Sequence, residues 1–112
     1  MREAHMRSGQ SVSERLAQLN PIERDGEIWW TIRDVCDALR IQTGQASKAI
    51  PPDLRRRILE YRPGYNSRII GITCMRGVEQ LVIRYSQEPR SVVMEALRKS
   101  RERIRDGIDE CR

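Results

Sequence analysis

The chain has 112 residues, of which 38% are hydrophobic and 33% charged, and its formal net charge is +5. This length suits one domain with a core of its own and excludes several domains. Arginine supplies all but two of the 21 basic residues, and its guanidinium binds phosphate and carboxylate groups well. The basic charge therefore fits two interpretations, contact with nucleic acid or a solvated basic surface.

The first part of the chain predicts a tail and a small ribbon. Residues 1–20 are expected to be a flexible tail or a short helix, because their apolar residues fall roughly on one helical face. The pair Asp25-Gly26 is a strong hairpin signal. It predicts two short strands over residues 21–24 and 27–32.

Both tryptophans, Trp29 and Trp30, lie in the second of these strands. Neighbouring residues of a strand face opposite sides, so at most one indole is expected in the core and the other is expected to be partly exposed. An exposed indole could stack on nucleic-acid bases. Packing beneath a neighbouring helix is the plainer interpretation.

A helix is predicted to start at Thr31, whose hydroxyl can accept a hydrogen bond from the Asp34 amide while the Asp34 carboxylate reaches back. Thr43-Gly44 is expected to end this helix, and a second short helix is predicted over residues 45–50. Two short helices across a glycine turn, in a basic chain, favour a helix-turn-helix that contacts DNA.

The turn and the start of the second helix carry polar side chains. In a helix-turn-helix these positions face the major groove, where glutamine pairs with adenine. A solvated helical surface is the alternative interpretation. The predicted DNA-binding residues of this segment are Gln42, Thr43, Gln45 and Lys48, and Ser47 lies among them.

The densest basic run follows. Residues 53–57 are predicted to form a helical turn, and residues 58–61 and 68–73 are predicted to be the strands of a second hairpin. Three consecutive arginines cannot share one face, but two of them can join a neighbouring arginine in a phosphate-binding patch. The residues predicted for this patch are Arg55, Arg56, Arg57, Arg62 and Arg68. Tyr61 and Tyr65 lie beside it and suit a protein interface.

Two more helices complete the expected fold. The first is predicted to run from about Thr73 to near Tyr85, and the second to start at about Pro89. Residues 101–112 are expected to be a charged helical extension. The core face predicted for the last helix consists of Val92, Val93, Ala96 and Leu97.

One segment also carries a family pattern. Its residues are Trp29, Trp30, Arg33, Asp34, Val35, Cys36, Asp37, Ala38 and Leu39. A second set, less specific, consists of Ile72, Gly77, Leu81, Val82, Arg84, Tyr85, Ser86 and Pro89. Over residues 22–98 the chain resembles the N-terminal domain of the BRO family, which occurs in bacteriophage antirepressors and in large DNA viruses of insects.

The resemblance implies an α+β domain over residues 21–100, with small antiparallel hairpins packed with about four helices. It implies a protein of a mobile element that acts on DNA or on a regulatory protein. We therefore expect a phage or prophage DNA-binding regulatory protein, antirepressor-like. The alternative is an inhibitor that binds a host or phage nucleic-acid-binding complex, such as a repressor or, in the manner of an anti-CRISPR, a defence system.

Other chemistries have little support in the sequence. The three cysteines, Cys36, Cys74 and Cys111, are widely spaced and form no metal-binding pattern. No Ser/His/Asp set and no phosphate loop is present, so we expect neither an enzyme nor a cofactor. Buried thiols and the absence of a signal-like or membrane-length apolar run are typical of a cytoplasmic protein, here of a bacterial host. Double-stranded DNA, a repressor or defence protein, and a second copy of the chain are the partners to consider.

Overall fold

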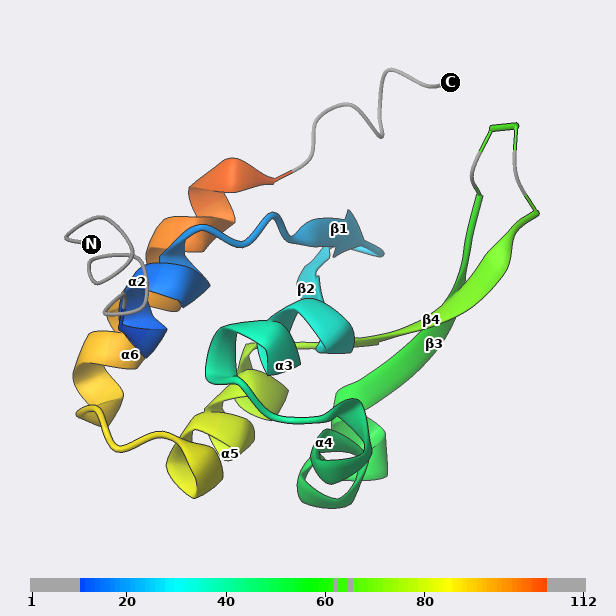
Figure 1. The fold of residues 1–112 in the computed structure, drawn as a ribbon. Coiled ribbons are helices and arrows are strands. Elements are labelled where there is room, and N and C mark those ends of the chain that lie inside the picture. Colours follow the sequence, from blue (N-terminus) through cyan, green and yellow to red (C-terminus); the bar gives the residue numbers. More distant parts are fainter. Residues whose placement is uncertain (1–10, 62, 65, 105–112) are drawn as a thin grey trace, which may run out of the picture.

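The computed structural model of the protein describes residues 11–61, 63–64 and 66–104. Within them the chain forms five α-helices and one four-stranded antiparallel sheet of strand order β1-β2-β4-β3 (Figure 1). The predicted α+β class is confirmed. The predictions made for residues 1–10, Arg62, Tyr65 and residues 105–112 lie outside the described residues.

The elements follow one another in short segments. The helices are α2 (Val12–Ala17), α3 (Ile32–Leu39), α4 (Thr43–Ala49), α5 (Met75–Tyr85) and α6 (Arg90–Ser100). The strands are β1 (Ile22–Arg24), β2 (Glu27–Thr31), β3 (Arg55–Glu60) and β4 (Arg68–Thr73). Two 3₁₀ turns, η1 (Pro52–Leu54) and η2 (Arg101–Arg103), precede β3 and follow α6.

Two local predictions were wrong. The arginine run is not helical, because the 3₁₀ turn ends at Leu54 and β3 begins at Arg55 to pair with the whole of β4. Gly44 does not break a helix either, since it lies in the first turn of α4. The preceding helix ends instead at Arg40, which adopts the left-handed conformation with φ of 60°.

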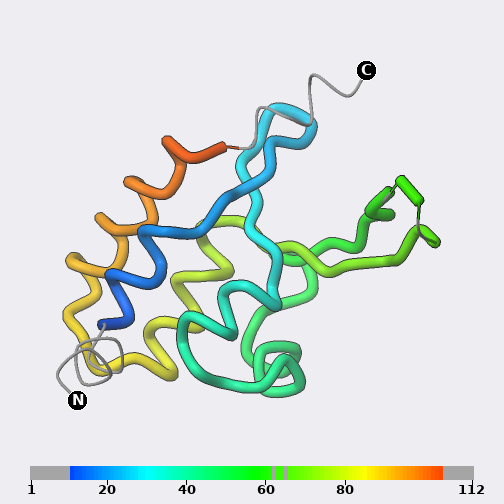
Figure 2. The backbone as a smooth tube through the Cα atoms, turned by 45° about the horizontal axis from the view of Figure 1, so that its top comes forward, coloured from blue at the N-terminus to red at the C-terminus, as the bar shows by residue number. Residues whose placement is uncertain are grey.

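The main core lies between the helices and one face of the sheet. Trp30 from β2 is buried there with side chains from all five described helices. Helix α2 lies beside α6 (Figure 2) and contributes Leu16, which is fully buried. In α6 the predicted core residues Val93, Ala96 and Leu97 are buried, but Val92 is 47% exposed because it lies on the outer face.

Both tryptophans are buried, contrary to the expectation that one would be partly exposed. Trp30 is 1% exposed and Trp29 is 7% exposed. They do face opposite sides of β2, but the second side has a small core of its own, formed by Trp29 with Ile58 and Ile72. The sheet is therefore packed on both faces near β2.

Helix α5 approaches the sheet closely at Gly77. A Cβ added there would come within 1.8 Å of Thr73 Oγ1 and 3.2 Å of Leu54 O. Thr73 Oγ1 already donates a hydrogen bond of 2.6 Å to Leu54 O. Glycine is required because these two groups occupy the space of a side chain, and the contact fixes η1 and β3 against the start of α5.

The β3–β4 hairpin extends away from the body as an arm (Figures 1 and 2). Only the inner end of β4 has a second neighbour, because β2 pairs with it at Ile72 and Thr73 alone. The arm runs out past α3 and α4, so these three elements border one surface of the molecule. The site residues predicted in the turn and in α4 lie on this surface, whereas the described arginines of the predicted patch are divided between the two faces of the arm.

Candidate nucleic-acid interface

Helices α3 and α4 are joined by a three-residue turn. Thr31 caps α3 by accepting a hydrogen bond of 3.4 Å from the Asp34 amide, but among the described residues no bond returns from the Asp34 carboxylate. After Leu39 the chain passes through Arg40, Ile41 and Gln42 before α4 begins. The amide of Ile41 donates to Cys36 O at 2.9 Å, which closes the end of α3. A turn of this length is typical of a helix-turn-helix.

Helix α4 uses glutamine at its start. The backbone amide of Gln42 donates to Gln45 Oε1 at 2.9 Å, so the Gln45 side chain satisfies one of the unpaired groups at the helix end. This bond occupies the Gln45 oxygen and leaves the side-chain NH₂ group without a hydrogen-bond partner among the described residues. Ser47 is likewise engaged, because its hydroxyl donates to Thr43 O at 3.3 Å.

Most of α4 faces solvent. Ala46 is the one fully buried residue in the helix, and Ile50 anchors its end in the core. The exposed positions are Gln42, Thr43, Gly44, Gln45, Ser47 and Lys48. The structure thus brings all the DNA-binding residues predicted in this segment to one short, exposed helix.

The predicted arginine patch is divided between two faces of the arm. Arg55 is half-buried and its Nε donates to Ile50 O at 3.0 Å, which holds the end of α4 against β3. Arg56 faces the other side, where it pairs with Asp25 at 2.7 Å. Arg68 pairs with Glu60 at 2.6 Å. Arg57 is exposed and, within the described part of the chain, has no acidic partner.

Unpaired cations lie on both sides of α4. Arg33 lines one hollow together with residues 42–44, and Arg57 lines another together with Ser47. Neither cation forms an ion pair among the described residues, and the same holds for Lys48 on α4 itself. Sequence reasoning missed Arg33, although a cation in the exposed first turn of a helix beside a polar turn was a usable signal.

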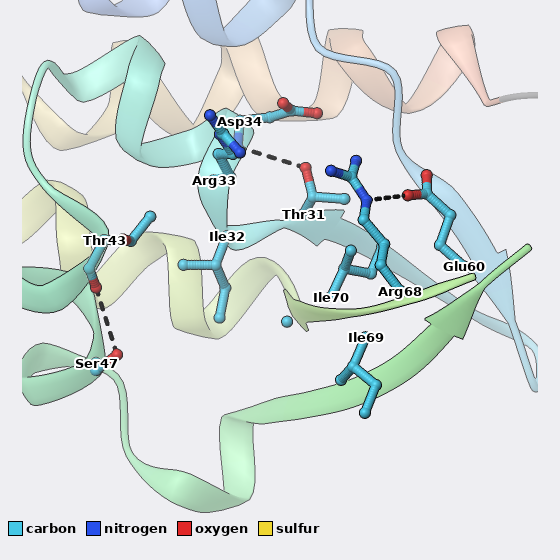
Figure 3. A pocket seen from close by; sticks show the side chains of 11 residues that line it. Thr31, Ile32, Arg33, Asp34, Thr43, Ser47, Glu60, Arg68, Ile69 and Ile70 are labelled. Atoms are coloured by element: carbon cyan, nitrogen blue, oxygen red, sulfur yellow. Dashed lines mark hydrogen bonds and ion pairs between the residues drawn. The ribbon is translucent and has the colours of Figure 1, made fainter. Parts of the chain in front are cut away.

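A groove of about 400 Å³ lies between the arm and the two helices (Figure 3). Thr43 and Ser47 of α4 line one side, and residues 68–71 of β4 line the other. Ile32, at the start of α3, lies between them. This groove was not predicted, because it arises from the packing of segments that lie about 25 to 40 residues apart in the chain.

The arm also exposes large apolar side chains. Tyr61 is 75% exposed, and the cross-strand pair Leu59 and Ile69 is 61% and 65% exposed. Sequence reasoning named Tyr61 but missed the other two. Both residues lie in strands that the sequence predicts, but only the register of the hairpin places them opposite each other on an exposed face.

The Cys36 thiol lies buried in the main core. Burial, reinforced by the neighbouring Asp37 charge, raises the pKa of the Cys36 thiol to about 11, so this thiol is protonated and unreactive at neutral pH. Within the described ranges, no three His, Cys, Asp or Glu side chains gather closely enough to hold a metal ion. In the same part of the chain, no helix is long and apolar enough to cross a membrane.

No family model, curated protein or solved structure matches the chain. The similarity to the BRO family therefore rests on the sequence pattern alone and stays a prediction.

Proposed function

We propose that the protein is a regulatory DNA-binding protein in which α4 enters the major groove of a duplex. The observation that carries this proposal is the three-residue turn followed by a helix whose exposed residues are almost all polar. The second helix of a helix-turn-helix places its N-terminal residues against base edges. In this chain Gln42, Thr43 and Gln45 occupy those positions.

The charges around α4 support the same proposal. Lys48, Arg33 and Arg57 lie on or beside the helix without acidic partners among the described residues, so their charges are available to phosphates. Phosphate contacts orient a protein on a duplex, whereas base contacts specify its sequence. Arg57 lies on the arm, which would follow the backbone beside the groove that α4 enters. The BRO-like pattern makes a phage or prophage regulator, antirepressor-like, the expected context.

The test is a fluorescence-anisotropy titration of labelled duplexes at low salt, repeated as salt rises. Three phosphate contacts predict that the logarithm of the association constant falls with a slope of about −2.7 against the logarithm of salt concentration. Lys48→Gln should reduce that slope by about 0.9. Lys99→Gln is the matched control, because Lys99 is an exposed lysine on α6, outside the proposed interface. Absence of binding to any duplex at low salt would refute the proposal.

A second variant tests base reading. Gln45→Glu retains the oxygen that accepts from the Gln42 amide, so α4 should still form. It removes the side-chain NH₂ donor and adds a negative charge beside the bases. We expect circular dichroism to be unchanged and duplex affinity to fall at least about tenfold. An unaltered affinity would place the duplex elsewhere on the molecule.

The exposed apolar residues of the arm favour a second candidate, an inhibitor that binds a repressor or defence protein. Tyr61, Leu59 and Ile69 together resemble the apolar anchors found at protein interfaces. Purification of the tagged protein from a nuclease-treated host lysate tests this function. A partner that survives nuclease and is lost in Leu59→Ser supports it, and loss of every partner on nuclease treatment contradicts it.

A further inference from the structure

Strand β4 is paired along its whole length on one side only. β3 pairs with it from Arg68 to Thr73, whereas β2 reaches only Ile72 and Thr73 before the chain leaves the sheet at Ile32. In the described part of the chain, residues 68–71 therefore have an open edge. Alternate residues of a strand direct their N–H and C=O groups to such an edge, where they can pair with another strand.

This open edge lines the groove of about 400 Å³, so residues of α3 and α4 lie opposite it. Figure 3 shows Thr43 and Ser47 across from Ile69 and Ile70, with Ile32 between the two sides. One extended strand is narrow enough to lie along β4, because neighbouring strands are about 4.8 Å apart. Four residues of β4 offer about 13 Å of edge, which corresponds to four residues of an incoming strand.

The charges of the groove fit a peptide better than a polyanion. Arg68 is neutralised by Glu60 at 2.6 Å, and Asp34 lies in the first turn of α3, where the helix dipole favours a negative charge. Arg33 is the lining cation without an acidic partner among the described residues. The groove can thus accept one carboxylate, and its remaining surface offers backbone groups and the apolar side chains of Ile32 and Ile69.

We infer that this groove binds an extended segment of a partner protein by strand addition to β4. The segment would alternate apolar residues, which pack on Ile32 and Ile69, with polar residues that include one acid facing Arg33. Main-chain hydrogen bonds supply affinity in this mode of recognition, and the alternate side chains supply specificity. The inference does not depend on DNA binding, although a bound segment would also cover the side of α4 that carries Thr43 and Ser47.

The probe is a synthetic capped hexapeptide, Thr-Val-Asp-Val-Thr-Val, added to the full chain during two-dimensional NMR. Two further versions carry N-methyl groups, one on the first, third and fifth residues and one on the second, fourth and sixth. We expect amide shifts at residues 68–71 with the parent peptide. One methylated version should bind at least about tenfold more weakly while the other binds about as well as the parent, because one set of alternate amides faces β4.

Arg33→Gln tests the charged contact, with Arg24→Gln as the matched control, since Arg24 is an exposed arginine of β1 outside the groove. Arg33→Gln should weaken the peptide about three- to fivefold and leave the Asp-to-Asn peptide unaffected. Three results would overturn the inference: no binding of the parent peptide at about 1 mM, equal weakening by both methylation patterns, or shifts at residues 68–71 caused by a thymidine hexanucleotide and not by the peptide.

Discussion

Trp29 and Trp30 are adjacent in one strand, yet they lie in two different environments. Trp30 belongs to the large core beneath the helices, and its indole N–H donates to Ser100 Oγ at 3.0 Å. Trp29 belongs to the small cluster on the opposite face of the sheet, and its indole nitrogen is buried without a hydrogen-bond partner among the described residues. Arg56 covers it, with the guanidinium carbon 5.6 Å from the ring centre.

The difference shows two ways to bury an aromatic ring. On the Trp30 face a layer of helices excludes water. On the Trp29 face a charged side chain closes the cluster, and Asp25 holds that side chain in place at 2.7 Å. Long charged side chains can cover apolar surface with their stems and still keep the charged group in water. A ring on such a face is buried but less strongly anchored, and this contrast can be measured.

The largest expected loss of stability follows truncation of Trp30, the ring that is hydrogen-bonded within the main core. Trp30→Ala leaves a large cavity in the main core and removes the hydrogen bond that Ser100 Oγ accepts, so it should cost about 4–5 kcal/mol of unfolding free energy. Trp29→Ala should cost about 3 kcal/mol or less, because Arg56 and the neighbouring side chains at the edge can relax into the space. Urea unfolding followed by circular dichroism measures both. A larger loss for Trp29→Ala would reverse the ranking of the two faces.

The two faces of the sheet also carry different cysteines, and the burial of Cys36 on the Trp30 face makes the stability of the fold depend on pH. Cys36 belongs to the Trp30 cluster and is buried, and its pKa is raised to about 11. A thiol whose folded pKa exceeds its unfolded value of about 9 stabilises the fold below pH 9, and this contribution is lost as pH rises towards 11. We expect the wild type to lose about 2 kcal/mol more stability between pH 8 and pH 10.5 than Cys36→Ala does.

The control is Cys74→Ala, because Cys74 is a half-buried residue packed against the Trp29 cluster. This variant retains Cys36, so its alkaline loss should match that of the wild type. Equal losses in all three proteins would show that the Cys36 thiol does not titrate differently on folding.

Much of the fold follows from local sequence signals. The Asp25-Gly26 turn places two residues of positive φ where β1 and β2 join, and the Thr31 hydroxyl caps α3 as expected. These predictions succeed because the turn and the cap are made by residues close in sequence. The polar face of α4 was also predictable, since the same few residues form both the helix and its surface.

The failures concern contacts between distant segments. The burial of Trp29 depends on Ile58, Ile72 and Arg56, which alternation within β2 cannot reveal. The arginine run is likewise not one continuous patch, because Arg56 pairs with Asp25, 31 residues earlier in the chain. Whether an arginine is available to a ligand depends on its partners in space, so a cluster in the sequence overstates the basic surface.

The hydrogen bond to Ser100 distinguishes the Trp30 ring from the Trp29 ring. Ser100 Oγ accepts from Trp30 Nε1 at 3.0 Å and donates to Leu97 O at 2.8 Å, and Ser100 is fully buried. Ser100→Ala should therefore cost about 1–2 kcal/mol, because it leaves a buried indole N–H without a partner. Thermal and urea unfolding both report this loss. Ser91→Ala on the same helix is the control, since Ser91 is exposed and should change stability by less than about 0.5 kcal/mol.

The smallest expected effect is Trp29→Phe. Phenylalanine fills less of the cluster, but it also removes the buried N–H that has no partner, and these two contributions oppose each other. The unfolding free energy of Trp29→Phe should stay within about 1 kcal/mol of the wild-type value. Trp30→Phe loses both side-chain volume and the hydrogen bond to Ser100, so it should cost at least about 2 kcal/mol. Urea unfolding of the two variants compares the rings directly. Equal losses would mean that the unpaired N–H of Trp29 costs nothing in the folded protein, and the contrast between the faces would then reduce to ring packing.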